Sequence, residues 1–394
     1  MQQVDVIIIG AGAAGLMCAA QAGLRGRRVL VLDNAKKFGR KILISGGGAC
    51  NFTNYHNSAE HYICQNPHFV KSALARFSHW DFIAKVCEYE IEYEERKHGQ
   101  LFCLNSSKDI VDMLIAECAK GGVDWRLKQE IQAIEKVDSG YQVNTAQDTY
   151  LCTSLVIATG GLSMPKLGAT PFGYKIANQF SIPVIPTNAG LVPFTLGGKE
   201  KDILASLSGI SIDVEITTLQ GVSFKEALLF THRGLSGPVV LQTSSYWNLG
   251  ESIKLNLVPE LDIETLMQDE AIQHPNQGVK TFLSKIFPKR LAEGLLLMWN
   301  MSDKPMKQLL HKEKASLIEN LTQWQLKPSG TEGYRTAEVT LGGVDTNYIS
   351  SKTMEVKHMP GLYFIGEVLD VAGHLGGHNF QWCWSSGWVC GQNV

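Results

Sequence analysis

Three glycines near the start of the chain have a spacing that serves phosphate binding. Gly10, Gly12 and Gly15 form a G-x-G-x-x-G motif. In such a motif the first glycine permits a tight turn, the second lets backbone approach a pyrophosphate, and the third lets a helix pack closely on a strand. Asp33 follows at a distance where a carboxylate can accept hydrogen bonds from the hydroxyls of an adenosine ribose and repel a 2′-phosphate. These residue types indicate a dinucleotide site.

The sequence around these residues supplies the elements that such a site requires. Val4–Ile9 is a nearly continuous apolar run and predicts a strand buried on both faces. Leu16–Leu24 predicts a helix whose positive N-terminal end faces the phosphates. Arg28–Leu32 predicts a second strand that ends at Asp33. The whole pattern predicts the nucleotide-binding half of an α/β domain.

A basic segment leads into a second group of glycines. Residues 36–41 include four lysines or arginines, and Gly46–Gly48 offers another place where backbone can lie against a cofactor. Arg40 and Lys41 could contact the phosphates or a flavin ring. The alternative for these two residues is a solvated basic loop.

Cys50 follows these glycines in a setting that raises a redox question. Pyridine-nucleotide disulfide reductases carry a second cysteine five positions later, where this chain has Tyr55. A dithiol relay is therefore not expected, and we interpret Cys50 as a packed thiol. Nine cysteines without a C-x-x-C pair fit reduced thiols in a cytoplasm better than a disulfide framework or a zinc site, so no metal is predicted.

Composition is that of an ordinary globular protein. Of its residues, 44% are hydrophobic and 19% are charged. The length of 394 residues is enough for two or three domains. A formal net charge of −2 argues against a general binder of nucleic acid or membrane surfaces. The N-terminus lacks a basic region before an apolar stretch, so no signal peptide is expected. We expect a cytoplasmic protein with a small-molecule substrate, no nucleic-acid partner and no membrane partner. The oligomeric state stays open.

The middle of the chain divides into segments of different periodicity. Before residue 190 the patterns predict helices at His68–Glu90 and Asp109–Lys120, followed by strands at Asp124–Leu127, Gln129–Val137 and Tyr141–Asn144. After it, short alternating runs predict an antiparallel sheet or barrel at Leu191–Leu196, Ser211–Thr217, Val222–Phe230 and Ser252–Leu257. Helical patterns then cover Glu264–His274, Gly278–Ile286, Lys289–Trp299 and Met306–Trp324, and strand-like sequence returns at 325–327 and 337–341.

Two later turns also carry glycines where a cofactor could lie. An apolar strand at 154–157 runs into Thr159-Gly160-Gly161, and another at 361–365 ends in Gly366-Glu367. Gly376-Gly377-His378-Asn379 then starts a helix from about Phe380 to Cys390, whose N–H groups could face the N1/O2 edge of a flavin. The alternative is an ordinary helix cap. The chain has no second strand–G-x-G-x-x-G–helix unit followed by an acidic residue for a ribose. A separate nicotinamide-binding domain is therefore not expected.

Several stretches together resemble one family, the bacterial YhiN/BaiN-like flavoproteins, also called NAD(P)/FAD-dependent oxidoreductases or aminoacetone oxidase-like proteins. The resemblance spans almost the whole chain. The stretches that carry it are Gly10–Gly15, G-R-K-I-L-I-S-G-G-G at 39–48 with 50–54, A-T-G-G at 158–161, F-T-H-R-G-L-S-G-P at 230–238, A-E-V-T-L-G-G-V at 337–344, G-L-Y-F-I-G-E-V-L-D at 361–370 and G-G-H-N at 376–379. Two positions depart from the pattern, Ala49 where a basic residue is common and His378 where tyrosine is common.

The resemblance implies an α/β fold with a Rossmann-type, glutathione-reductase-like FAD-binding domain, an inserted antiparallel β domain and a small helical insert. We place the FAD-binding domain at 1–189 and 349–394, the β-barrel-like domain at 190–261 and 325–348, and the helical insert at 262–324. The candidate cofactor-binding residues are Gly10, Gly12, Ala13, Ala14, Gly15, Asp33, Asn34, Arg40, Lys41, Ser45, Gly46, Gly47, Gly48, Ile131, Thr159, Gly160, Gly161, Gly366, Glu367, Asp370, Gly376, Gly377, His378, Asn379 and Phe380.

The function expected from these observations is an FAD-dependent oxidoreductase that transfers a hydride between flavin N5 and a small organic substrate. NAD(P)H could serve as a transient electron donor, and the choice among NADH, NADPH and oxygen stays open. One alternative is an amine oxidase that uses oxygen. Another is a C=C reductase, because the C-terminal block resembles that of fumarate reductases. An alternative of another class is a flavin-binding regulatory protein without turnover.

Three residues of the inserted segment are candidates for catalysis. His232 and Arg233 lie in the Phe230–Pro238 turn, and Arg335 precedes the A-E-V-T stretch. An arginine fork could hold a carboxylate or carbonyl, and histidine is suited to proton transfer near neutral pH. We expect substrate between the flavin ring and the inserted domain, near these residues. The alternative is structural, with His232 and Arg233 capping the sheet and Arg335 paired with Glu338 or Glu332.

Overall fold

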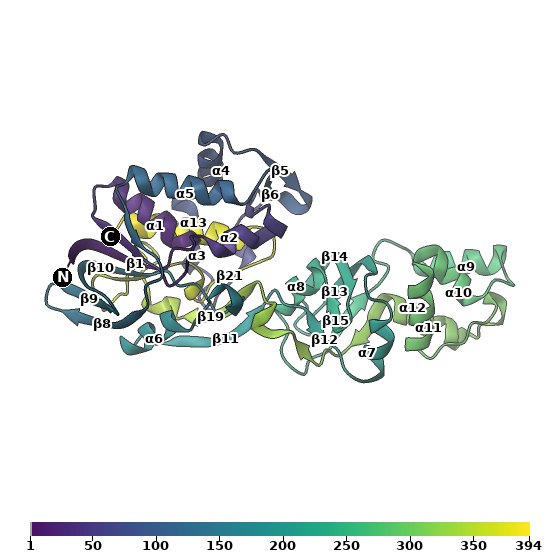
Figure 1. Cartoon of the computed structure of the whole chain (residues 1–394). Coiled ribbons are helices and arrows are strands. Elements are labelled where there is room, and N and C mark those ends of the chain that lie inside the picture. Colours follow the sequence, from purple (N-terminus) through teal and green to yellow (C-terminus); the bar gives the residue numbers. More distant parts are fainter. Residues whose placement is uncertain (1) are drawn as a thin grey trace. The chain divides into compact units, whose positions relative to one another are not determined.

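The chain forms two structural units that divide at residues 189/190 and 337/338. The computed structural model describes residues 2–394, apart from the side chain of Lys199. The first unit contains the chain up to Ala189 together with Glu338–Val394, and the second contains Gly190–Ala337. The first unit has a core of its own around its central sheet, and the second has a separate core. The two units are coloured by their place in the sequence in Figure 1.

The central sheet of the first unit is mostly parallel and places the predicted site. Its strand order is β7-β2-β1-β10-β9-β8, and β20 also pairs with β10. The β-branched run of β1 is buried at its centre, as expected for a strand covered on both faces. The strands are β1 (Gln2–Ile9), β2 (Val29–Leu32), β7 (Asp124–Arg126), β8 (Ile131–Val137), β9 (Gly140–Thr145), β10 (Thr149–Ile157) and β20 (Leu362–Phe364).

Two helices from opposite ends of the chain pack on this sheet side by side. They are α1 (Ala13–Leu24) and α13 (His378–Gly391), which lie next to each other in Figure 1. Small residues permit the approach, since a Cβ on Gly387 would lie 2.5 Å from the carbonyl oxygen of Ala14. The first βα turn and the last glycine-rich loop therefore belong to one packed layer. The other helices of this unit are α2 (Arg40–Ile44), α3 (Phe69–Arg76), α4 (His79–Glu88), α5 (Lys108–Lys120) and α6 (Phe172–Gln179).

The single helix expected at His68–Glu90 is wrong, because the structure has two helices there. α3 ends at Arg76 and α4 begins at His79. Ser78 caps α4, since its side chain accepts the N–H of Asp81 while the Asp81 carboxylate accepts the N–H of Ser78. This capping box starts a new helix where the apolar periodicity alone runs on.

The first unit also extends further back along the sequence than expected. Residues 338–348, assigned above to the β domain, lie in the first unit because β19 (Val339–Val344) pairs with β11 (Val184–Gly190). The β19 sequence, V-T-L-G-G-V, does not by itself show which sheet it joins. The remaining strands of this unit are β3 (Asn51–Asn54), β4 (Tyr62–Ile63), β5 (Tyr93–Arg96), β6 (Gln100–Cys103) and β21 (Ala372–Gly373).

The second unit is built on one antiparallel sheet of the expected kind. Its strand order is β17-β16-β13-β14-β15-β12-β18. β13 and β14 form a regular hairpin from Ser211↔Leu229 to Thr217↔Ser223. The strands are β12 (Phe194–Thr195), β13 (Ser211–Thr217), β14 (Ser223–Phe230), β15 (Gly234–Ser236), β16 (Ile253–Asn256), β17 (Trp324–Leu326) and β18 (Gly330–Thr331).

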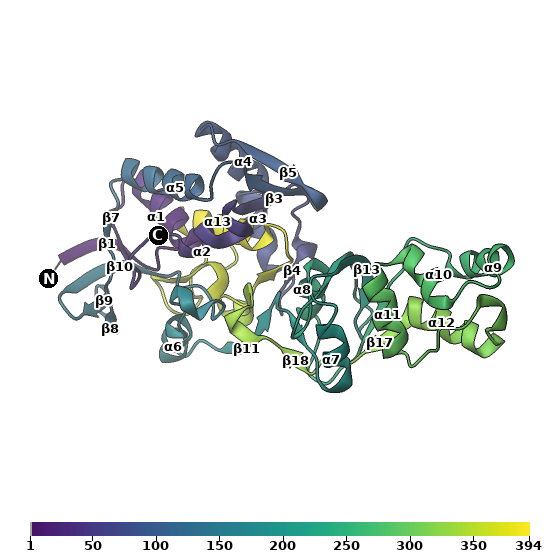
Figure 2. The same cartoon turned by 45° about the vertical axis from the view of Figure 1, so that its right-hand side comes forward.

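The helical insert shares its core with this sheet. Leu255 of the sheet and Phe282 and Leu317 of the helices are fully buried in the same apolar cluster. The insert is therefore part of the second unit, and Figure 2 shows its helices grouped together. The helices of this unit are α7 (Gly198–Ala205), α8 (Pro238–Ser244), α9 (Ile263–Gln273), α10 (Val279–Ile286), α11 (Lys289–Met298) and α12 (His311–Gln323). α7 and α8 were not expected. Among the described residues, no helix combines the length and apolarity needed to cross a membrane.

Candidate functional site

The first glycine turn has the geometry that the spacing predicts. Gly10 has φ +114°, and a Cβ there would lie 2.4 Å from the carbonyl oxygen of Ala158. A Cβ on Gly15 would lie 1.9 Å from the carbonyl oxygen of Gly10. A Cβ on Gly12 would meet nothing within 4 Å. Two glycines therefore permit close packing, and the middle one faces open space next to the start of α1.

Asp33 is fixed beside this turn by two backbone hydrogen bonds. Its Oδ2 accepts the N–H of Ala11 at 2.6 Å, and its Oδ1 accepts the N–H of Ala35 at 2.6 Å. Each carboxylate oxygen keeps capacity for a further donor, such as a ribose hydroxyl. Asn34, which follows, is exposed.

Further glycines extend the open space. A Cβ on Gly47, Gly48 or Gly160 would meet nothing within 4 Å, as at Gly12, whereas Gly46 lies against the Phe102 ring. The backbone there can approach a ligand closely without a side chain between them.

A buried hydroxyl beside these glycines also lacks a protein partner. Thr159 Oγ1 has no hydrogen-bond partner in the part of the chain that the structure describes. Together with the open glycines, this orphaned donor fits a bound dinucleotide.

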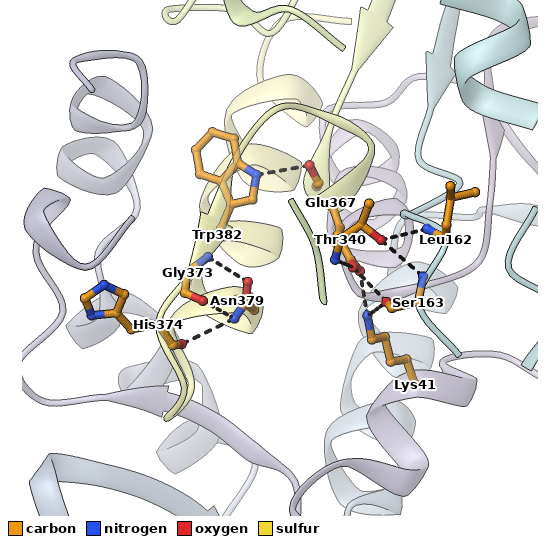
Figure 3. A network of polar contacts seen from close by, with 10 residues as sticks. Lys41, Leu162, Ser163, Thr340, Glu367, Gly373, His374, Asn379 and Trp382 are labelled. Carbon is orange, nitrogen blue, oxygen red and sulfur yellow. Dashed lines mark hydrogen bonds and ion pairs between the residues drawn. The ribbon is translucent and has the colours of Figure 1, made fainter. Parts of the chain in front are cut away.

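A polar network ties four segments of the chain together at this site. Lys41 Nζ donates to Glu367 Oε2 at 2.7 Å and to Ser163 Oγ at 2.8 Å, as Figure 3 shows. Ser163 in turn donates to Glu367 Oε1 at 3.0 Å, and the N–H of Thr340 donates to the same oxygen at 3.0 Å. The carboxylate is mostly buried, so these charge-assisted bonds orient Lys41 strongly.

Thr340 also fixes the turn that contains Thr159, Gly160 and Gly161. Its Oγ1 accepts the N–H groups of Leu162 at 2.8 Å and Ser163 at 3.1 Å. A Cβ on Gly161 would lie 2.4 Å from that oxygen, so a glycine is needed here for close approach. Neither Ser163 nor Thr340 was among the residues predicted from the sequence, although Thr340 lies inside the 337–344 stretch that carried the resemblance and Ser163 lies two residues after the 158–161 stretch.

Glu338 adds a second acid to this neighbourhood. Burial raises its pKa, and the charge of Lys41 opposes that rise. The sequence analysis proposed Glu338 only as an ion-pair partner of Arg335. The structure instead brings its charge within reach of Lys41 in the first unit.

The other candidates of the early segments have mixed placements. Arg40 packs its guanidinium against Gly168, where a Cβ would lie 2.6 Å from Nη2. Ser45 Oγ donates to the carbonyl oxygen of Ile42 at 2.8 Å. Ala13 and Ala14 are buried in α1, and Ile131 is half-buried at the start of β8, packed against the core.

The C-terminal glycine loop is held by its own side chains. The Asn379 side chain accepts the N–H of Gly373 and donates to its carbonyl oxygen, both at 2.8 Å, as Figure 3 shows. The indole of Trp382 donates to the carbonyl oxygen of Gly366 at 3.0 Å. Phe380 stacks on Trp384. Asn379 therefore holds the loop in shape, while Gly376 and Gly377 adopt positive φ values.

His378 points into a cluster of histidines at the start of α13. Its Nδ1 lies 2.9 Å from Asn57 Oδ1, and its ring stacks on His61 with centroids 4.4 Å apart. Burial lowers its pKa well below the usual range, and the nearby His61 and His374 lower it further. Burial, with His61, also lowers the pKa of His374 to about 4. These rings are neutral at physiological pH.

Asp370 lies in the same block and is held by backbone. Its Oδ2 accepts the N–H of Gln65 at 3.0 Å. Burial raises its pKa, and that hydrogen bond opposes the rise.

The three catalytic candidates lie in the second unit and are exposed. His232 and Arg233 occupy the turn between β14 and β15, which the Thr231 N–H closes onto the Gly234 carbonyl oxygen at 2.9 Å. Arg233 Nη1 lies 3.9 Å from Glu332 Oε2. Arg335 ends a 3₁₀ turn and makes no ion pair among residues 2–394. Their expected position near a flavin stays a prediction.

Cys50 is a fully buried free thiol. Burial raises its pKa far above the usual value, and a hydrogen bond with Ser45 opposes this only in part. A protonated thiol is a poor nucleophile, which agrees with the interpretation as packing. In the described part of the chain, no group of three or more histidine, cysteine or acidic residues is arranged to hold a metal.

The fold and its open glycines define a protein with a Rossmann-type nucleotide-binding fold. The sequence-family model described as the HI0933-like protein Rossmann domain matches residues 4–393. The chain therefore belongs to this flavoprotein family. The match confirms the resemblance drawn from the motifs. The protein is an enzyme, a flavin-dependent oxidoreductase.

Relatives match over the full length. The chain is 56% identical over 394 residues to the ribosomal RNA dihydrouridine synthase of Escherichia coli, with 100% of this chain and 98% of that protein covered. It is 52% identical to the Haemophilus influenzae protein of the same name, with 100% and 99% covered. It is 25% identical to the 3-dehydro-bile acid delta(4,6)-reductase of Clostridium scindens, with 98% and 97% covered.

Among solved structures, the open conformation of a flavocytochrome c3 fumarate reductase shares the fold. Its TM-score is 0.50 at 14% identity, with 100% of this chain and 78% of that chain covered.

Proposed function

We propose that this protein uses FAD to reduce the C5=C6 bond of a uridine in ribosomal RNA, giving dihydrouridine. The observation that carries the proposal is the 56% identity, over the whole chain, to a protein named for that product. A reduced flavin supplies the hydride when it is bound.

FAD is favoured over FMN by residues at two ends of the site. The open glycine at Gly12 suits a pyrophosphate, and Asp33 suits the ribose of an adenosine half. FMN has neither part. We therefore expect the purified protein to release FAD on denaturation.

The chain's own contribution is placement and hydrogen bonding. The Lys41 ammonium is paired with the Glu367 carboxylate, which balances its charge, and it is also held by Ser163, so it is a fixed hydrogen-bond donor. Uracil reduction places transient negative charge on a carbonyl oxygen conjugated with the C=C bond. The third N–H of the Lys41 ammonium, which neither partner uses, is a preorganised donor for such an oxygen.

The proposal replaces the expectation of a small substrate and no nucleic acid. That expectation rested on a formal net charge of −2, which averages over the whole chain. A net charge describes long-range attraction and leaves local contacts open. NAD(P)H remains the proposed electron donor.

The test uses ribosomal RNA from cells that lack the gene. The FAD-loaded protein is incubated with this RNA and NADPH or NADH, and nucleosides are measured by mass spectrometry. We expect dihydrouridine to appear only with reduced flavin. A protein with full FAD content and a reducible flavin that forms no dihydrouridine contradicts the proposal.

A second candidate is reduction of a small conjugated enone. It is favoured by the full-length match to a protein named as a delta(4,6)-reductase of a 3-dehydro-bile acid. Both named reactions saturate a C=C bond conjugated with a carbonyl group, which is the C=C reductase alternative stated from the sequence. Substrate-dependent reoxidation of the reduced flavin, with an enone and with RNA compared side by side, separates the two.

A further inference from the structure

A surface pocket in the first unit is lined by cationic and polar side chains together with Phe69 and Ile349. It lies where the chain before α3 meets the segment after β19. No acidic side chain lines it among residues 2–394. The residues that matter here are Asn66, His68, Ser350, Ser351, Lys352 and Lys357, and we call it the Lys352 pocket.

Hydrogen bonds brace the pocket both within one wall and between its two walls. Lys357 Nζ donates to the carbonyl oxygen of Asn347 at 2.7 Å, and Asn66 Nδ2 donates to Asn347 Oδ1 at 3.3 Å. Arg76 donates to the carbonyl oxygen of Lys352. The lysines are thus carried on a braced segment, and this preorganisation lowers the entropy lost on binding.

The positive charges of the pocket are not neutralised by the protein. Lys352 and Lys357 are exposed, and neither makes an ion pair in the described part of the chain. Asp345 and Asp370, which lie in the same part of the unit, accept the backbone N–H groups of Asn347 at 2.8 Å and Gln65 at 3.0 Å, and neither lines the pocket. α3 also begins at the pocket, which places its positive end there.

Short connections join the pocket to the glycine-rich loop before α13, which is predicted to contact the flavin. β4, three residues before Asn66, pairs with β21, and β21 leads directly to His374 and the start of α13. Cys64 Sγ also lies 3.5 Å from Thr346 Oγ1. An anion in the pocket would therefore be bound in the same unit as the glycine-lined site.

We propose that the Lys352 pocket binds a phosphate group. Two ammonium groups, an imidazole and hydroxyls without a competing carboxylate suit a phosphate better than an apolar ligand. The inference rests on the proposed function for its ligand. The phosphate belongs either to the backbone of the substrate RNA or to the pyridine-nucleotide donor.

The central variant is Lys352→Ala/Lys357→Ala, made in the FAD-loaded full chain. Lys307→Ala/Lys312→Ala is the matched control, because it removes the same charge from two exposed lysines without ion pairs in the described residues. Lys352→Arg/Lys357→Arg keeps the charge. FAD content and melting temperature are checked first for all three.

The RNA arm measures binding of a ribosomal RNA fragment by fluorescence anisotropy over a range of salt. We expect the alanine pair to bind roughly tenfold more weakly, with a salt slope lower by about 1 for each lost contact. The arginine pair should bind like the parent. Equal weakening in the matched control overturns the proposal, because the effect would then follow total charge.

The donor arm measures anaerobic reduction of the bound flavin by NADPH without RNA. A higher half-saturating NADPH concentration in the alanine pair, with unchanged RNA binding, assigns the phosphate to the donor. No change in either arm overturns the pocket. Since RNA binding is read without turnover, a protein that binds through these lysines but makes no dihydrouridine refutes the proposed function and leaves the pocket standing.

Discussion

Polar residues are used very differently in the two units. In the first, Glu367 receives Lys41 and Ser163 at 2.7 and 3.0 Å, and only 14% of its side chain is exposed. In the second, Arg233 approaches Glu332 at 3.9 Å with 57% of its own side chain exposed. The first arrangement joins segments that are hundreds of residues apart in sequence. The second joins the exposed turn before β15 to Glu332, which directly follows β18.

The two arrangements should respond differently when a polar residue is substituted. Where a polar network links the core to the predicted cofactor site, loss of one residue changes folding and binding together. Where a side chain is exposed and loosely paired, its removal leaves the fold nearly unchanged. The predictions below test this distinction, from the largest expected effect to the smallest.

The largest effect is expected at Gly15. Gly15→Ala places a Cβ 1.9 Å from the Gly10 carbonyl oxygen, so α1 must move away from β1. Overpacking of this severity should cost about 3 kcal/mol or more of unfolding free energy, measured by urea denaturation. FAD content should fall in parallel, since the same turn carries the phosphate site.

Gly12 supplies the matched control within the same motif. Gly12 has φ −85° and ψ −169°, which any residue adopts, and its Cβ would meet nothing within 4 Å. Gly12→Ala should therefore unfold like the parent as apoprotein, yet bind FAD at least about tenfold more weakly. Full FAD affinity in Gly12→Ala would show that the pyrophosphate lies elsewhere.

These glycines also show how much the sequence could predict. The spacing of Gly10, Gly12 and Gly15 predicts their separate roles, because each role follows from a fixed offset between a strand and a helix. The partners of Lys41 could not be predicted in this way. Ser163 and Glu367 are brought to it by packing of distant segments, which no local pattern encodes.

Segment boundaries failed for a related reason. Residues 338–348 looked like part of the β domain because they are strand-like and follow it directly. Only the pairing of β19 with β11 assigns them to the first unit. Likewise, the break between α3 and α4 depends on the Ser78 cap, which competes with an unbroken apolar periodicity.

Glu117 offers a buried charge cluster away from the predicted site. Burial raises its pKa, but hydrogen bonds from Lys120, Lys85 and Tyr89 outweigh this and lower it to about 2. Glu117→Ala should cost about 3 kcal/mol, because it leaves Lys85 without its buried partner. FAD content per folded molecule should stay at the parent level. A loss of FAD in the folded variant would contradict the claim that Glu117 affects stability without affecting the cofactor site.

The same cluster predicts a dependence of stability on pH. The folded pKa of Glu117 is about 2, below its unfolded value, so the folded state favours the ionised form. Its contribution is therefore complete above about pH 5 and is lost as pH falls toward 2. Urea denaturation between pH 3 and pH 6 should show a steeper loss of stability in the parent than in Glu117→Gln. Parallel curves would contradict the assignment.

A smaller effect on stability is expected at Glu367. Glu367→Gln keeps the shape but weakens the bonds from Lys41, Ser163 and the Thr340 N–H, since charge-assisted hydrogen bonds exceed neutral ones. We expect a loss of about 2 kcal/mol. Unlike Glu117, this change should also lower FAD affinity, measured by flavin fluorescence titration. Unchanged affinity would place the network outside the cofactor site.

The smallest effect on stability is expected for the exposed group in the second unit. His232→Ala, Arg233→Ala and Arg335→Ala should each change the unfolding free energy by less than about 0.5 kcal/mol, because exposed ion pairs contribute little. FAD content should also be unchanged, so a loss of turnover in these variants would report contact with the substrate. We expect at least one of them to slow the reoxidation of reduced flavin by ribosomal RNA about tenfold, with Arg233→Lys as the charge-preserving control. If all three reoxidise at the parent rate, the active site does not involve this turn, and the exposed arginines serve the surface of the second unit alone.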